Sequence, residues 1–163
     1  MGEPSNKPPR GNIVFRTGVV AAYIYRRVAN GVEYLVLKRQ SRYMFGLWQQ
    51  VAGSIEEGET AVRAILRELK EETGLIPVAL YSADIVETFY DYEYNVINMV
   101  PIFVAEFAHD GEVILSNEHS EYKWVKANEA KEHFTFPQQR MSLELIEREF
   151  VNKTPPEILK IKL

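Results

Sequence analysis

Three glutamates in the middle of the chain have the residue type and spacing that metal chemistry requires. Glu68, Glu71 and Glu72 stand at i, i+3 and i+4, so on a helix they share one face. At about 100° per residue, Glu68 and Glu72 fall beside Ala64 and Ile65, at the edge of the apolar side. Carboxylates crowded there repel one another and are costly to desolvate, and a divalent cation relieves both penalties. Such an oxygen-rich site suits Mg²⁺ or Mn²⁺, and a solvated acidic helix face is the alternative.

The segment around these glutamates carries the start and stop signals of a helix. Thr60 suits the N-cap position, and residues 61–73 contain no proline or glycine and are rich in strong helix formers. Gly74 suits the position just after a helix, and Pro77 follows shortly beyond it. The sequence therefore predicts a helix over residues 61–73.

This segment resembles the Nudix box, G-x5-E-x7-R-E-U-x-E-E-x-G-U, where U is an apolar residue. The chain matches the box at every fixed position, which are Gly53, Glu59, Arg67, Glu68, Leu69, Glu71, Glu72, Gly74 and Leu75. Nine constrained positions over a fixed span make a specific signal. The resemblance implies a Nudix hydrolase, an enzyme that cleaves a phosphoanhydride bond in nucleoside diphosphates linked to another group. It also implies an α/β/α sandwich with a mixed sheet.

The resemblance implies a metal site within and beside the box. Glu68 and Glu72 are the expected metal ligands, and Glu71 is expected to be a ligand or a catalytic bridging group. By similarity to the family, the main-chain carbonyl of Ala52 completes the ligand set. Divalent ions held by carboxylates neutralise a polyphosphate, stabilise the leaving oxygen and help to activate water.

The remaining box residues are expected to support these ligands. Arg67, counted here with the catalytic residues, is expected to pair with Glu59 and orient the carboxylates, and a simple helix salt bridge is the alternative. Gly53, Gly58 and Gly74 are expected at backbone turns.

One further carboxylate outside the box is expected, as a ligand or a general base. Glu118 is the candidate because it precedes a predicted strand, and Glu121 is the second choice. The alternative is that both are exposed loop acids. His119 stands next to Glu118, but a lone histidine is more often a structural residue than a catalyst.

Four residues are candidates for substrate binding. Arg39 and Arg16 are predicted to bind phosphate, with a plain surface charge as the alternative. Trp48 and Tyr90 are predicted to stack on a flat ring, with ordinary core or hairpin packing as the alternative.

Three segments resemble the bacterial dihydroneopterin triphosphate pyrophosphatase group: residues 47–61, 118–124 and 139–150. This resemblance implies metal-dependent hydrolysis of a nucleoside or pterin triphosphate to the monophosphate and pyrophosphate. The W-x-x-P-K-G pattern usual in diadenosine tetraphosphate hydrolases is absent, because residues 48–53 read W-Q-Q-V-A-G. A dinucleoside polyphosphate or other nucleoside diphosphate-linked substrate is the alternative. A non-catalytic nucleotide-binding module is disfavoured because every box glutamate is present. The loop at residues 40–46 is longer than in the dihydroneopterin triphosphate pyrophosphatase pattern, so the sequence does not identify the base of the substrate.

The amino-acid composition argues against several classes of protein, among them nucleic-acid-binding, membrane-binding and disulfide-containing proteins. The 163 residues are 46% hydrophobic and 26% charged, with a net charge of −4 and no cysteine. This balance predicts neither nucleic-acid nor membrane binding. The absence of cysteine excludes disulfides and thiolate ligands, and together with the lack of a visible signal peptide it leads us to expect a cytoplasmic protein. The expected partner is a small nucleotide or pterin triphosphate, and a homodimer stays open.

The chain is predicted to form one α+β domain with a mixed sheet. Residues 1–11 are expected to be a flexible arm, residues 12–153 the Nudix domain, and residues 154–163 a tail that is loose or adds an edge strand. Asn30-Gly31 predicts a hairpin turn. Strands are predicted at residues 17–25, 33–39, 47–52, 79–89, 96–107 and 121–125. Two further helices are predicted at residues 127–133 and 137–150.

Overall fold

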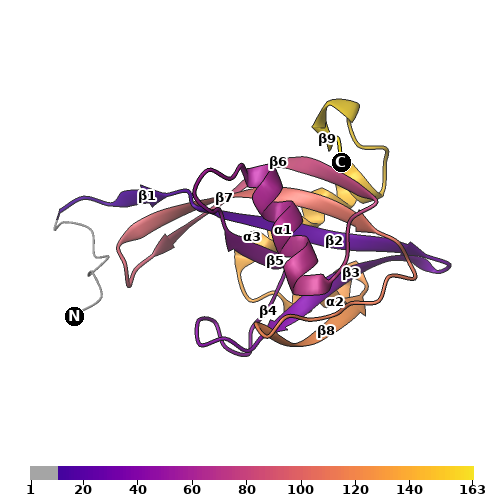
Figure 1. Cartoon of the computed structure of the whole chain (residues 1–163), viewed down its shortest axis with the longest axis horizontal. Helices are drawn as coiled ribbons and strands as arrows, with labels where there is room; N and C mark the ends of the chain where they lie inside the picture. Colours follow the sequence, from indigo (N-terminus) through magenta and orange to yellow (C-terminus); the bar gives the residue numbers. More distant parts are fainter. Residues whose placement is uncertain (1–10) are drawn as a thin grey trace.

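A mixed β-sheet with helices on both faces forms the body of the molecule in this computed structural model, which describes residues 11–163 (Figure 1). The strands are β1 (Val14–Arg16), β2 (Val19–Val28), β3 (Gly31–Arg39), β4 (Trp48–Gln49), β5 (Val51–Ser54), β6 (Ala79–Asp91), β7 (Val96–Phe107), β8 (His119–Val125) and β9 (Lys160–Ile161). The helices are α1 (Ala61–Thr73), α2 (Ala127–His133) and α3 (Pro137–Ile146), followed by a π turn (Glu147–Val151) and a 3-10 turn (Glu157–Leu159).

The sheet is mixed because β1 and β2 pair with β7 in parallel, whereas the other strand pairs of the described residues are antiparallel. Its main path runs β4-β3-β2-β7-β6-β9, with β8 beside β3, β5 beside β2 and β1 beside β7. The predicted hairpin at Asn30-Gly31 is confirmed, because Val28 pairs with Gly31 across the turn. A second hairpin joins β6 and β7, and Asp91 pairs with Val96 at its end.

The sheet separates two cores because alternate side chains of each strand point to opposite faces. Ile24 of β2 packs in the core that contains Leu69 of α1, whereas Tyr23 of β2 packs in the core that contains Leu143 and Ile146 of α3. Figure 1 shows α1 in front of the sheet, with α3 behind it. The predicted α+β class and the α/β/α layering are therefore confirmed.

The single strand predicted at residues 47–52 is wrong in one respect, because it is divided at Gln50. β4 pairs with β3 and β5 pairs with β2, so the chain changes neighbour at this residue. The buried Gln50 side chain accepts a hydrogen bond from Gln139 Nε2 over 2.7 Å. The division places β5 directly beside α1.

The helix predicted at residues 137–150 is also shorter than expected. Regular α-helix ends at Ile146, and in the π turn that follows Asn152 N–H donates to Glu147 O over 2.9 Å. Phe150 and Val151 are buried there, so the wider turn brings both side chains into the core.

Two terminal segments, an N-terminal arm and a C-terminal tail, were predicted from the sequence. The arm predicted at residues 1–11 lies outside the described residues, apart from Gly11. At the other end, β9 extends the sheet by pairing with Leu80 and Tyr81 of β6. Within residues 11–163, no helix is long and apolar enough to cross a membrane.

Candidate active site

Helix α1 has the bounds and the end signals that the sequence predicts. Thr60 is the N-cap, and its hydroxyl accepts a hydrogen bond from Arg63 N–H over 3.3 Å. Gly74 adopts the left-handed conformation (φ 71°), and its N–H donates to Lys70 O over 2.8 Å. Both ends of the helix are thus satisfied locally, which stabilises the helix that carries the three glutamates.

Arg67 connects four oxygen-bearing groups at the edge of this helix. Its guanidinium donates to both carboxylate oxygens of Glu59, at 3.1 and 3.0 Å, which confirms the predicted pair. It also donates to Glu68 Oε1 at 2.6 Å, to Glu71 Oε2 at 3.3 Å and to the Ser54 carbonyl at 2.8 Å. The hydrogen bonds from Arg67 lower the pKa of Glu59. One arginine therefore ties α1 to the strand and the loop before it.

Gly53 is needed for close approach and not for a turn, which corrects the expectation. A Cβ at this position would lie 2.0 Å from Glu68 Cδ, so the Glu68 carboxylate occupies the space that a side chain would take. Gly58 and Gly74 do have positive φ, at 76° and 71°, as turns require. Burial raises the pKa of Glu68, and the hydrogen bond from Arg67 opposes that rise.

Glu72 is the most deeply buried carboxylate of the cluster, with 2% of its surface exposed. Neither of its oxygens has a hydrogen-bond partner among residues 11–163. Burial, followed by the negative charges of Glu68 and Glu118, raises the pKa of Glu72 to about 9. A buried polar group without a partner is costly, so this carboxylate calls for a proton or a cation.

The residues present fit a hard divalent cation in their chemistry. Glu72 offers two unpartnered oxygens, and Glu68 lies beside the Gly53 main chain. Among the described residues, however, no three acidic, histidine or cysteine side chains converge as a ready ligand group. Arg67 pairs with Glu68 and with the exposed Glu71, whose side chain is 58% accessible. Ala52 stands in β5, where it pairs with β2.

Glu118 belongs to the electrostatic surroundings of the α1 carboxylates, although it lies outside the box. Its charge contributes to the raised pKa of both Glu72 and Glu68. Its Oε2 lies 3.3 Å from Arg39 Nη2. Glu121, the second choice, instead forms an ion pair with Lys38 Nζ at 3.7 Å. The structure thus brings Glu118 and Arg39 together beside the cluster.

His119 is buried directly beside Glu118. Its position in the sheet is opposite Arg39, and neither of its ring nitrogens has a hydrogen-bond partner in the described part of the chain. Burial, together with the charge of Arg39, lowers the pKa of His119 to about 4. The ring is therefore neutral at pH 7, in agreement with a structural role.

The structure does not bring Trp48 to the carboxylates. The Trp48 ring packs against the core on the α2 and α3 side of the sheet, 4.8 Å from the ring of His133. Lys123 Nζ lies 4.8 Å from its centroid on the same side. The packing alternative therefore describes Trp48 better than stacking at the α1 cluster.

Strand β1, which contains Arg16, and the β6–β7 hairpin, which contains Tyr90, extend beyond the helices (Figure 1). The Tyr90 hydroxyl donates to Asn95 Oδ1 over 2.9 Å within the β6–β7 hairpin. The Arg16 guanidinium lies over the ring of Tyr94, 5.5 Å from its centroid. Both side chains are thus engaged with this hairpin in the structure.

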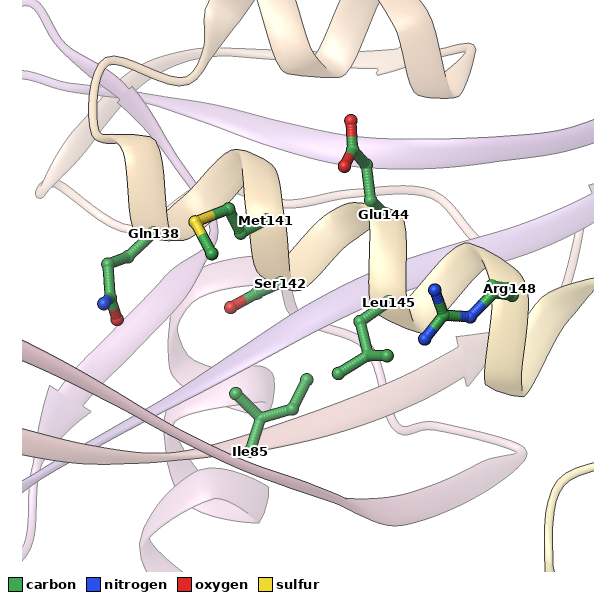
Figure 2. Close-up of a pocket in the computed structure, with 7 residues that line it drawn as sticks. All are labelled: Ile85, Gln138, Met141, Ser142, Glu144, Leu145 and Arg148. Carbon is green, nitrogen blue, oxygen red and sulfur yellow. The ribbon is translucent and has the colours of Figure 1, made fainter.

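A groove of about 350 Å³ lies on the opposite face of the sheet from α1. It separates β6 from α3, and Figure 2 shows its lining side chains, which are Ile85, Gln138, Met141, Ser142, Glu144, Leu145 and Arg148. None of the predicted site residues lines it. The carboxylate cluster, and not this groove, is the candidate active site.

Gln40, which was not among the predicted site residues, connects a loop to the Glu118 segment. Gln40 Nε2 donates to the Asn117 carbonyl over 2.6 Å. Residues 77 positions apart make this contact, and no local pattern in the sequence marks it.

The site is thus a group of carboxylates held by one arginine, on a helix that packs against a mixed sheet. A family model described as NUDIX domain matches residues 15–145, most of the chain. The chain therefore belongs to the Nudix family of hydrolases, and the predicted enzyme class, acting on phosphoanhydride bonds, is confirmed at the level of the family.

The relatives of this chain include both a dinucleoside tetraphosphatase and a pterin triphosphate diphosphatase. The asymmetrical bis(5'-nucleosyl)-tetraphosphatase of Caenorhabditis elegans is 31% identical over 66% of this chain and 77% of that protein. The dihydroneopterin triphosphate diphosphatase of Escherichia coli is 32% identical over 56% of this chain and 69% of that protein. A 41% identical segment of Putative nudix hydrolase 1 from C. elegans covers 42% of this chain but only 17% of that longer protein.

The fold also matches a solved structure. The E. coli dihydroneopterin triphosphate pyrophosphohydrolase superposes with a TM-score of 0.68 and 27% sequence identity. The match covers 86% of this chain and 99% of that one. The layering described above is thus that of a known Nudix hydrolase.

Proposed function

We propose that the protein is a divalent-cation-dependent hydrolase that converts a nucleoside or pterin triphosphate to the monophosphate and pyrophosphate. The observation that carries the proposal is the Glu72 carboxylate, which is buried without a partner in the field of Glu68 and Glu118. Two relatives, the C. elegans tetraphosphatase and the E. coli dihydroneopterin triphosphate diphosphatase, support a polyphosphate substrate. A triphosphate is preferred as the substrate because residues 47–61 and 118–124 resemble the dihydroneopterin triphosphate pyrophosphatase group.

Glu72 and Glu68 are the residues proposed to hold Mg²⁺ or Mn²⁺, with Glu71 and the main-chain carbonyl of Ala52 as further ligands. Bound there, the cation supplies positive charge that neutralises the polyphosphate and stabilises the pyrophosphate leaving group. Arg67 keeps Glu68 and Glu71 on the site side of α1, because its guanidinium donates to both carboxylates.

Glu118 is proposed to accept a proton from the attacking water. Its charge reaches Glu72, and its Oε2 lies 3.3 Å from the Arg39 guanidinium. A carboxylate in this role contributes about 10²–10⁴-fold to the rate. Arg39 is also proposed to contact a substrate phosphate. Arg16 is kept as a second phosphate candidate, and Tyr90 as a candidate for stacking on the base.

A substrate panel tests this function. Nucleoside triphosphates, dihydroneopterin triphosphate and diadenosine tetraphosphate are incubated with Mg²⁺ or with chelator, and phosphate and pyrophosphate are measured separately. We expect pyrophosphate from a triphosphate, and no turnover in chelator. Hydrolysis in ¹⁸O-labelled water is expected to label the monophosphate, because attack falls on the α phosphorus. Orthophosphate as the main product, or full activity in chelator, contradicts the proposal.

A dinucleoside polyphosphate is the second candidate substrate. The C. elegans tetraphosphatase, 31% identical over 77% of its own length, favours it. A strong preference for diadenosine tetraphosphate in the same panel would select this alternative. The Nudix membership of the chain would be unaffected.

A further inference from the structure

The base of the loop at residues 40–46 is tied to the segment that carries Glu118. Gln40 N–H donates to the Glu118 carbonyl over 2.9 Å, and Gln40 Nε2 donates to the Asn117 carbonyl over 2.6 Å. The loop itself is closed by a hydrogen bond of 2.8 Å from Gly46 N–H to the Arg39 carbonyl. An ordered loop therefore holds two consecutive carbonyls of the Glu118 segment.

These bonds occur where the regular ladder between β3 and β8 ends. Lys38 pairs with Glu121, and the register then shifts so that Arg39 pairs with His119. Such an irregularity interrupts the ladder and leaves nearby main-chain groups unpaired. Gln40 supplies partners at this point, so its two hydrogen bonds hold main chain that the sheet no longer holds.

The Glu118 side chain has little else to fix its place. It is 49% accessible, and its ion pair within residues 11–163 is the one with Arg39. Arg39 in turn donates from Nε to the Tyr43 carbonyl, at 3.0 Å, inside the same loop. Both the main chain and the carboxylate of Glu118 thus depend on contacts with this loop.

We propose that Gln40 is a positioning residue for Glu118, so that the loop and the carboxylate move as one unit. The inference rests on the proposed function, in which Glu118 accepts a proton from water. Proton transfer requires heavy atoms within hydrogen-bond reach, and small misplacements of a reacting group lower the rate. Loss of the Gln40 side-chain donor therefore acts on turnover and not on substrate affinity.

Gln40→Met tests the inference, because methionine keeps the length of the side chain and the main-chain N–H but removes the donor. The loss of one hydrogen bond predicts a kcat lower by about 2- to 10-fold, with KM changed by less than about twofold. Gln138→Met is the matched control. Gln138 accepts a hydrogen bond from Thr88 N–H at the α3 groove, away from the cluster, and its replacement is expected to leave kcat unchanged.

The same substitution in a Glu118→Gln background separates the inference from the proposed function. We expect Gln40→Met to lower kcat in the wild-type background and to have no further effect once the carboxylate is gone. An equal loss in both backgrounds, or full kcat in Gln40→Met beside an impaired Glu118→Gln, overturns the inference alone. Full kcat in Glu118→Gln overturns the role of Glu118 and the inference with it. Thermal unfolding of each variant verifies folding, and Gln40→Ala repeats the test.

Discussion

Glu72 and Glu87 are buried carboxylates on opposite faces of one sheet, 2% and 6% exposed, but their surroundings differ. Tyr23 OH donates to Glu87 Oε1 over 2.6 Å, whereas no residue among 11–163 donates to Glu72. Burial raises the pKa of both groups. The bond from Tyr23 opposes the rise at Glu87, and the charge of Glu68 adds to the rise at Glu72. A buried carboxylate that the fold satisfies needs no ligand, and one that it leaves unsatisfied points to a ligand.

The largest expected effect on turnover concerns Glu118, whose charge acts on Glu72. Glu118→Gln removes the proposed proton acceptor and should lower kcat by about 10²–10⁴-fold, with a smaller change in KM. Glu121→Gln is the matched control, since Glu121 pairs with Lys38. Steady-state kinetics with Mg²⁺ measure both. A more severe loss in Glu121→Gln would reverse the assignment.

Replacing each buried carboxylate in turn addresses the comparison itself. Glu72→Gln keeps the size of the side chain and removes its charge, so kcat should fall on the order of 10²-fold or more if Glu72 holds the cation. Glu87→Gln should leave kcat close to that of the wild type, because Tyr23 can still donate to the amide oxygen. Equal losses in the two variants would remove the distinction.

The local features of the fold and of the site could be predicted from the sequence. The bounds of α1 and its Thr60 and Gly74 caps follow from local start and stop signals, and the Arg67–Glu59 pair follows from the resemblance to the Nudix box. The β2–β3 turn follows from Asn30-Gly31, because this pair of residues favours a tight hairpin turn.

The contacts between distant segments could not be predicted. β1 has three largely exposed residues and no alternation that marks a strand, yet it pairs with β7. The place of Glu118 beside Arg39, and the bonds of Gln40, depend on how β3 and β8 end. The close approach of Glu68 to Gly53 depends on the packing of α1 against β5. Tertiary packing decides each of these, so single-residue patterns do not reveal them.

Removing the partner of Glu87 should cost stability and not activity. Tyr23→Phe deletes the hydroxyl that donates to Glu87, so a buried carboxylate loses its hydrogen bond. The free energy of unfolding should fall by about 1–3 kcal/mol, while kcat of the folded enzyme stays the same. Urea unfolding and steady-state kinetics measure the two quantities. An unchanged unfolding free energy would show that the hydrogen bond does not stabilise the fold.

Stability without metal should depend on pH through Glu72. Its pKa is about 9 in the folded protein, against an ordinary value of 4.5. The folded state then binds the proton more tightly, so the free energy of unfolding falls as pH rises from about 4.5 to about 9. One proton limits the slope to about 1.4 kcal/mol per pH unit. Urea unfolding in chelator should show a flatter dependence for Glu72→Gln than for the wild type or Glu87→Gln. Identical slopes in the three proteins would be the contrary result.

Cation binding by the two glutamine variants decides whether the unsatisfied carboxylate is a metal ligand. Calorimetric titration with Mn²⁺ compares the wild type, Glu72→Gln and Glu87→Gln without substrate or turnover. The titration is made at pH 7.5, which is about one unit above the ordinary pKa of histidine. We predict that Glu72→Gln binds Mn²⁺ at least about 10-fold more weakly than the wild type, while Glu87→Gln binds it with unchanged affinity. Equal affinity of Glu72→Gln and the wild type would contradict the metal site on α1.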